Sequence, residues 1–199
     1  MPDYSYEKAA LQKGYKYICG VDEAGRGPLA GPVCAAAVIL PLDTVIEGLD
    51  DSKKLSEKKR EALFDLITEK AVAYGIAYGS VEEIEEFNIL GATYIAMCRA
   101  IEKLKKNPDY VLIDGNRFPP MLKTEGECIV KGDSKSMSIA AASILAKVTR
   151  DRLLLEYAEK YPEYGFEKHK GYGTKVHIEA IKKYGMCEIH RPSFLTKLI

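Results

Sequence analysis

Residues 17–32 read Tyr-Ile-Cys-Gly-Val-Asp-Glu-Ala-Gly-Arg-Gly-Pro-Leu-Ala-Gly-Pro, an apolar run followed by two carboxylates and a glycine-rich loop. The apolar run predicts a buried strand, which ends at Asp22 and Glu23. Carboxylates are costly to remove from water unless a metal ion or a charged partner compensates them. The glycines leave room for backbone to approach a ligand, and Arg26 can pair with a phosphate through two hydrogen bonds. This stretch therefore predicts a metal-dependent site that acts on a phosphate-containing polymer.

The rest of the chain supplies further strands and helices. Short apolar runs predict strands at 33–40, 72–79, 110–114 and 127–131. Apolar residues at helical spacing predict helices at 57–70, 89–106, 135–161 and 174–184, the first two capped by Ser56 and Asn88. We expect an α/β fold: a mixed five-stranded sheet flanked by helices, with the first strands antiparallel and the later ones parallel. A catalytic domain over 1–160 would carry a small C-terminal helical appendage over 161–199.

Charge gives weaker information than pattern. The formal net charge is zero, so no overall field favours a nucleic-acid partner. Residues 165–199, however, contain seven Lys or Arg against three Asp or Glu, together with all three histidines. This local excess fits either a basic face or an evenly solvated surface.

Cysteine usage and hydropathy suggest where the protein works. The five cysteines are scattered and include no C-x-x-C pair, which favours free thiols over disulfides. The chain does not open with a signal-like segment, and no apolar stretch has the length needed to span a bilayer. We therefore expect a reduced, cytoplasmic, soluble protein that makes no membrane contact and is a monomer.

Two further acids stand where predicted strands end. Asp114 closes the run 110–114, and Asp133 follows the run 127–131. Ligands gather at the carboxyl ends of parallel strands, so neighbouring strands would bring both acids to Asp22 and Glu23. A single such Asp is usually turn chemistry, but three positions favour a cluster, and clustered carboxylates either hold protons or bind cations. All-oxygen ligation suits Mg²⁺ or Mn²⁺.

The adjacent pair Asp22 and Glu23 raises a geometric question. Successive residues of a strand point to opposite faces, so both cannot face one site on a regular strand. Either the strand ends or bulges there, or only one side chain binds a metal directly while the other supports it.

A second pattern overlaps the loop. Residues 25–30 match G-x-G-x-x-A after a strand, and Asp50 and Asp51 follow at about the spacing of a ribose ligand. The alternative function is a dinucleotide-dependent oxidoreductase. That pattern requires a helix to begin at the loop, whereas Gly31 and Pro32 interrupt it and residues 33–40 predict a strand. A non-catalytic nucleic-acid-binding module is also disfavoured, because four clustered anions would face a polyanion.

Six stretches in the order and spacing of one known family run from about residue 15 to residue 195. They are residues 22–33, 51–56, 113–117, 131–133, 140–151 and 169–174. Through them the chain closely resembles bacterial ribonuclease HII. The resemblance implies a ribonuclease H-like fold and a two-metal site for Mg²⁺ or Mn²⁺. It also implies an endonuclease that hydrolyses the RNA strand of RNA–DNA hybrids. The same enzyme would cut 5′ of ribonucleotides embedded in duplex DNA, leaving 5′-phosphate and 3′-hydroxyl ends.

The resemblance also assigns roles to residues. An acidic tetrad would bind the metal ions and carry catalysis, with Asp22 at the centre of the sheet as the bridging ligand: Asp22, Glu23, Asp114 and Asp133. The residues implied to recognise the ribonucleotide are Gly25, Arg26, Gly27 and Tyr172. Four lysines would hold backbone phosphates, although each is singly an ordinary surface residue: Lys53, Lys54, Lys168 and Lys170. Asp151 also matches a family position, and we interpret it as structural, closing the long helix.

Overall fold

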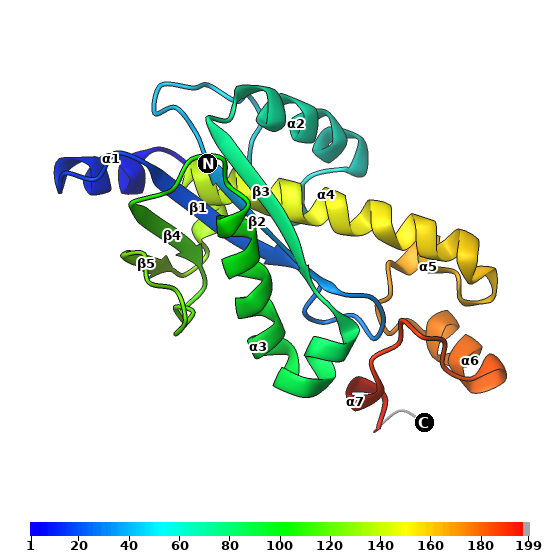
Figure 1. Ribbon diagram of the computed structural model, residues 1–199. Helices are drawn as coiled ribbons and strands as arrows, with labels where there is room; N and C mark the ends of the chain where they lie inside the picture. The colour runs from blue at the N-terminus through cyan, green and yellow to red at the C-terminus, as the bar shows by residue number, and fades with distance from the viewer. Residues whose placement is uncertain (197–199) are drawn as a thin grey trace.

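A computed structural model describes residues 1–196, so residues 197–199 of the predicted appendage lie outside the described part (Figure 1). The strands are β1 (Ile18–Ala24), β2 (Val33–Ile39), β3 (Ala73–Gly79), β4 (Tyr110–Asp114) and β5 (Gly126–Ile129). The helices are α1 (Ser5–Gln12), α2 (Glu57–Lys70), α3 (Val81–Glu102), α4 (Met137–Lys160), α5 (Phe166–His169), α6 (Lys175–Tyr184) and α7 (Pro192–Leu195). Short 3₁₀ turns are η1 (Ser52–Lys54), η2 (Gly132–Ser134) and η3 (Pro162–Tyr164).

The strands form one mixed sheet in the order β3-β2-β1-β4-β5. Strands β1, β2 and β3 pair antiparallel, whereas β1, β4 and β5 pair parallel. The predicted fold class, strand number and pairing directions are confirmed. Strand β1 lies at the centre, and its carboxyl end shares an edge of the sheet with the carboxyl ends of β4 and β5.

Side chains of β2 alternate between the two faces of the sheet, and this alternation explains the three layers of the fold. Val33, Ala35 and Ala37 pack in the core with α3, whereas Cys34 and Ala36 pack in the core with α4 and α2. Every residue of β2 is buried, so this strand reads as a continuous apolar run. Helix α3 therefore covers one face of the sheet, and α4 with α2 covers the other (Figure 1).

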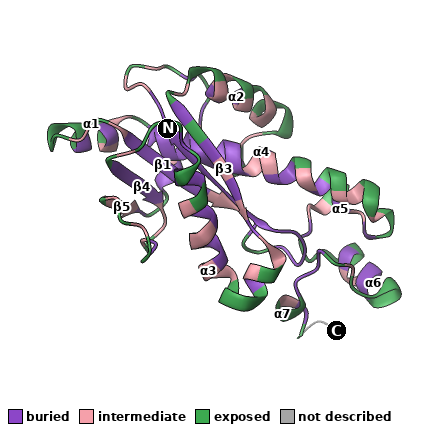
Figure 2. Ribbon diagram, in the orientation of Figure 1, coloured by how far each residue is buried: buried purple, intermediate pink, exposed green. Residues whose placement is uncertain are grey.

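Helix α4 lies unusually close to β1. A Cβ on Gly20 would stand 2.2 Å from the carbonyl carbon of Ser138, so only glycine permits this backbone approach. The first half of α4 is buried nearly all round, while its far end reaches solvent (Figure 2). The close approach places the middle of α4 beside the carboxyl end of β1.

Two helices differ from the sequence prediction. Helix α3 begins at Val81, seven residues before Asn88, behind a capping box of Ser80 and Glu83, and ends at Glu102. Val81, Ile84 and Phe87 recur every three residues in this acid-rich segment, a helical pattern that the sequence prediction did not use. Asn88 has a non-helical φ of 60°, and its side chain accepts hydrogen bonds from the N–H groups of Leu90 and Gly91. It therefore caps the second segment, as predicted. Helix α1 was not predicted.

The C-terminal segment has a small core of its own. Tyr164, Phe166, Ile181 and Leu195 pack there with Leu154 of α4. The division at residue 160 stays a prediction. Within residues 1–196, no helix combines the length and apolar character needed to cross a membrane.

Candidate metal centre and substrate pocket

Three carboxylates meet at the edge of the sheet. Parallel pairing places Val21 of β1 beside Ile113 of β4, so the following residues, Asp22 and Asp114, are neighbours on one face. Asp133 lies in η2, just after β5. One oxygen of each carboxylate lies within 4.8 Å of the others. The backbone N–H of Gly132 donates to Oδ1 of Asp114 at 2.6 Å, which joins the loop that carries Asp133 to β4.

Crowding and burial make Asp22 and Asp133 hard to ionise. Burial raises the pKa of Asp22 well above its ordinary value, and the nearby charges of Glu23 and Asp114 raise it further. Burial and Asp114 likewise raise the pKa of Asp133. A site whose carboxylates resist ionisation without a cation has the donor set and the electrostatics of a hard-metal site.

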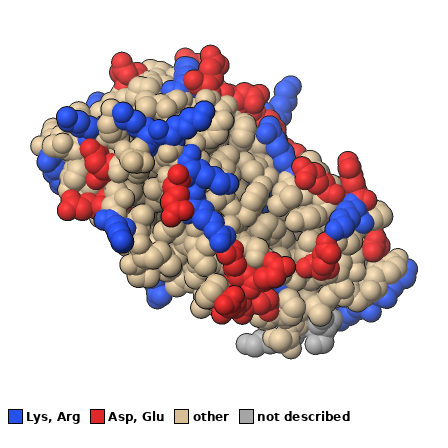
Figure 3. Space-filling model, in the orientation of Figure 1, with Lys and Arg blue, Asp and Glu red and all other residues tan. Residues whose placement is uncertain are grey.

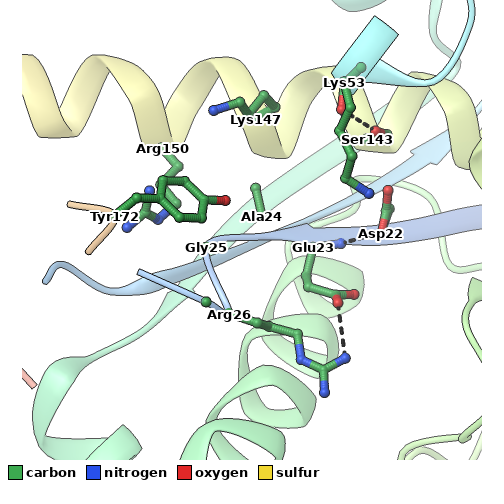
Figure 4. A pocket seen from close by; sticks show the side chains of 12 residues that line it. Asp22, Glu23, Ala24, Gly25, Arg26, Lys53, Ser143, Lys147, Arg150 and Tyr172 are labelled. Atoms are coloured by element: carbon green, nitrogen blue, oxygen red, sulfur yellow. Dashed lines mark hydrogen bonds and ion pairs between the residues drawn. The ribbon is translucent and has the colours of Figure 1, made fainter. Parts of the chain in front are cut away.

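Glu23 points away from this trio. Asp22 pairs with Ala36 in the register of β1 and β2, while Glu23 pairs with Ala35, which packs toward α3. The carboxylate of Glu23 forms an ion pair with Arg26 at 3.3 Å, on the side of β1 opposite to Asp22 (Figure 4). The strand continues without a bulge through both residues, so the pair faces two sides, as the alternation rule requires.

Lys53 supplies a positive charge beside the acids. Its Nζ lies 3.9 Å from Oδ2 of Asp133. Burial acts to lower the pKa of Lys53, but the charges of Asp22 and Asp133 outweigh burial and raise it. The neighbouring Ser52 receives a hydrogen bond at 2.7 Å from the hydroxyl of Ser143. This contact fixes η1, and with it Lys53, against α4.

A hollow of about 200 Å³ opens beside the acids (Figure 4). Its walls come from the end of β1, the following loop, η1, α4 and the C-terminal segment. The residues that line it include Asp22, Glu23, Gly25, Arg26, Gly27, Lys53, Ser143, Lys147, Arg150 and Tyr172. Five of the predicted substrate contacts thus share one hollow with two of the predicted acids.

Two buried arginines hold the glycine-rich loop through hydrogen bonds to its backbone. Arg150 donates to the carbonyl oxygens of Ala30, Pro32 and Lys170 at 2.9–3.1 Å. Arg191 donates to four carbonyl oxygens of the same loop at 2.7–3.1 Å, those of Gly25, Arg26, Pro28 and Gly31. Burial, together with the charge of Arg150, lowers the pKa of Arg191 to about 9. A Cβ on Gly25, whose φ is +97°, would stand 2.0 Å from Nε of Arg150, so this position requires glycine.

Tyr172 is held through its backbone, leaving its ring free. The side chain is 47% exposed, so about half of it is available to a ligand. Nδ1–H of His177 donates to the carbonyl oxygen of Tyr172 at 2.9 Å. Since Nδ1 carries that proton, Nε2 of His177 accepts from Nε2–H of His190 at 3.1 Å. Both histidines are buried, and this pair holds the backbone of Tyr172 in place beside the hollow.

The other predicted lysines lie outside the hollow. Lys54 is exposed and pairs with Asp50 at 3.2 Å. Lys168 is exposed, and Lys170 donates from Nζ to the carbonyl oxygen of Glu167 at 2.6 Å. The structure therefore brings only Lys53 of the four lysines to the acids.

The oxidoreductase alternative is wrong. The loop leads into β2, which pairs antiparallel with β1, and no helix begins there. Asp51 instead caps η1 by accepting from the N–H of Lys53 at 2.9 Å. Without a helix N-terminus at the loop, the G-x-G-x-x-A pattern has nothing to hold a pyrophosphate.

Asp151 does not close the long helix, which continues to Lys160. Its carboxylate accepts from Lys147 at 2.7 Å and pairs with Arg60 of α2 at 3.8 Å. It therefore joins α4 to α2, which corrects the predicted position while keeping a structural role.

Three residues of α4 that line the hollow had no role in the sequence prediction. Ser143, Lys147 and Arg150 come from α4. Their spacing of four and three residues puts them on one stripe of α4, and this polar stripe in the mostly buried part of the helix is the signal that could have found them.

The comparisons with known proteins agree with this geometry. The family model described as Ribonuclease HII matches residues 19–197. The ribonuclease HII of Clostridioides difficile (strain 630) is 60% identical over 194 residues, covering 98% of this chain and 76% of the relative. The solved ribonuclease H2 from Pyrococcus horikoshii OT3 has 28% identity and a TM-score of 0.71, covering 92% of this chain and 97% of that one.

A more distant solved structure shares the fold. It is Bst-RNase HIII in complex with Mn²⁺, with 20% identity and a TM-score of 0.61, covering 89% of this chain and 65% of that one. The family match spans nearly the whole chain, and the sheet is mixed and five-stranded, as the resemblance implied. The chain therefore belongs to the ribonuclease HII family and is a ribonuclease H.

Proposed function

We propose that this ribonuclease H hydrolyses the RNA strand of RNA–DNA hybrids and also cuts on the 5′ side of a ribonucleotide embedded in duplex DNA. The products would carry 5′-phosphate and 3′-hydroxyl ends. The observation that carries the proposal is the meeting of Asp22, Asp114 and Asp133 within 4.8 Å beside a hollow lined by Gly27 and Tyr172. The carboxylates that would bind metal and the site that would hold one sugar lie next to each other there.

The acids fit Mg²⁺ or Mn²⁺. Their donors are all oxygen, and the raised pKa values of Asp22 and Asp133 mark a cluster that a cation would stabilise in its ionised form. Mn²⁺ is present in the related Bst-RNase HIII structure. When two such ions are bound, they supply an activated water and stabilise the departing oxygen. Glu23 remains the proposed fourth carboxylate, because it lines the hollows on both sides of the cluster.

The chain's own residues would position the ribonucleotide. Gly27 has no side chain, so its backbone can approach the 2′-hydroxyl that distinguishes RNA from DNA. Arg150 and Arg191 keep that loop from shifting. The ring of Tyr172 offers a flat surface for the sugar or base. Lys53 would contact the phosphate beside the acids, with Arg26 at the loop.

The remaining features complete the proposal. Lys54, Lys168 and Lys170 would contact backbone phosphates farther from the cut, and the segment 161–199 would contact the substrate through Tyr172. The protein would act as a monomer in the cytoplasm. The five cysteines, which form no disulfide in the described residues, support a reducing setting.

Cleavage mapping tests the proposal. Three duplexes of one sequence are compared: all DNA, DNA with one ribonucleotide, and an RNA–DNA hybrid, each in Mg²⁺. The proposal requires one cut, 5′ of the single ribonucleotide, several cuts in the hybrid and none in DNA. A cut 3′ of the ribonucleotide, or equal cutting of the all-DNA duplex, would refute it.

A further inference from the structure

A second hollow lies on the other side of the acid cluster, between the end of β4 and α3. Its volume is about 370 Å³. Thr93 and Met97 of α3 are buried in its floor, and Leu90 and Tyr94 are partly buried beside them. Asn116 and Arg117 are exposed and come from the loop that follows Asp114. The hollow thus combines an apolar floor with a polar, cationic rim.

The two hollows flank the catalytic acids. Glu23 and Arg26 line both of them, while Asp114 lines only the second and Asp22 only the first. Figure 4 shows why: Glu23 and Arg26 turn to the side of β1 that Asp22 does not face. Gly27, Lys53 and Tyr172 belong to the first hollow alone. A strand laid across the acids from the first hollow would therefore reach the second.

Arg117 is the cation that gives the second hollow its chemistry. In the described part of the chain Arg117 forms no ion pair, whereas Arg26 pairs with Glu23 at 3.3 Å. A guanidinium with free donors suits a phosphodiester, because it can give two parallel hydrogen bonds to its oxygens. The apolar floor, with the ring of Tyr94, suits the sugar and base attached to that phosphate.

We propose that this second hollow binds the nucleotide on the 5′ side of the cut, with Arg117 on its phosphate. The inference rests on the proposed function, which puts the ribonucleotide in the first hollow and the cut on its 5′ side. The scissile phosphate then lies over the acids, and the strand continues in the 5′ direction toward Asn116 and Arg117. This contact would recognise the phosphate backbone of the substrate and not its base sequence.

A scan with neutral phosphates tests this contact. The substrate is a duplex with one ribonucleotide, and phosphates 5′ of the cut are replaced one at a time by uncharged methylphosphonates. For the wild type, replacement of the phosphate bound by Arg117 lowers kcat/KM about tenfold, which equals roughly 1.4 kcal/mol. Arg117→Gln shows a similar loss on the unmodified duplex and no further loss when that one phosphate is neutral.

The matched control is Lys123→Gln, which removes an exposed cation at the far end of the same connection between β4 and β5. It keeps the full penalty at that phosphate. Because Arg117 is exposed, both variants retain the wild-type melting temperature. Equal sensitivity of Arg117→Gln and wild type at every position would overturn the inference. A wild type that cuts none of the duplexes would overturn the proposed function, and this inference with it.

Discussion

At the scale of single residues, Asp22 is a buried acid that the proposed metal site requires in its charged form. Burial and its acidic neighbours raise its pKa, so the protonated form is the one the metal-free fold prefers. The stability linked to Asp22 is therefore present at low pH and is lost as the pH rises through this raised pKa. Near neutral pH the metal-free protein carries that cost, and a bound cation removes it.

Replacement of Asp22 separates stability from catalysis. In the absence of metal at pH 7.5, we expect Asp22→Asn to raise the melting temperature by on the order of 3 °C, because about 1 kcal/mol shifts a domain of this size by that amount. Mg²⁺ should raise the melting temperature of the wild type and not of the variant, which should not cut. Asp65→Asn, on the exposed surface of α2, is the control. A variant that cuts at a near-normal rate would remove Asp22 from the metal site.

Gly27 and Tyr172 line the same hollow, and together they test the proposed recognition of the ribonucleotide. A methyl group on Gly27 would meet only Cε1 of Tyr172, at an ordinary 3.7 Å, so Gly27→Ala should fold normally yet cut poorly. Gly25→Ala, which would collide with Arg150, should lose stability as well. Tyr172→Phe should keep most activity, while Tyr172→Ala should fall roughly ten- to a hundredfold if stacking contributes about 1–3 kcal/mol. If Tyr172→Ala and the wild type cleave the single-ribonucleotide duplex at equal rates, Tyr172 is an ordinary surface tyrosine with no role in recognition.

At the scale of elements, the parts that follow from local pattern were predictable. The strand ranges agree closely, because each strand is a short apolar run between turn residues. The meeting of Asp22, Asp114 and Asp133 follows from parallel strands that end at one edge. The role of Arg191 did not follow, because its partners are backbone carbonyls up to 166 residues away in sequence. No residue pattern records a contact with a distant carbonyl.

The buried pair of histidines that joins α6 to the segment before α7 leads to a prediction about how stability depends on pH. Burial lowers the pKa of His177 to about 4, so below pH 6.5 the unfolded chain takes up a proton that the folded chain refuses. Stability should fall as the pH drops from about 6.5 toward 4, with His177 contributing about 1.4 kcal/mol per pH unit. Urea unfolding of wild type and His177→Asn across this range measures the difference in slope. Identical slopes would contradict the buried neutral pair.

At the scale of the whole molecule, zero net charge conceals an uneven surface. Acidic side chains gather over the N-terminal part of α3, while basic side chains line the edge at α6 (Figure 3). The sequence showed the basic excess of 165–199 but not its arrangement, because folding decides which of these lysines share a face. Lys168 and Lys170 come just before Tyr172 in the chain, and neither lines the hollows beside the acids.

Salt dependence measures what these lysines do. Binding of a non-cleavable duplex should weaken with salt, with a log–log slope of about −0.9 for each phosphate neutralised. Joint replacement of Lys168 and Lys170 by Gln should flatten the slope by about one to two phosphate contacts, without moving the cut. Joint replacement of Lys182 and Lys183, which are exposed on α6, is the control. Equal flattening in both double variants would mean that only general charge matters.

The central claim is that cations held by Asp22, Asp114 and Asp133 act on the phosphate 5′ of a ribonucleotide. Its most direct test replaces one non-bridging oxygen of that phosphate by sulfur, in each stereoisomer, and compares single-turnover cleavage in Mg²⁺ and Mn²⁺. Sulfur is a poor ligand for Mg²⁺ and a better one for the softer Mn²⁺. The account predicts that at least one isomer is cut much more slowly in Mg²⁺ and recovers in Mn²⁺. Equal cleavage of both isomers and the all-oxygen duplex in Mg²⁺ would contradict it.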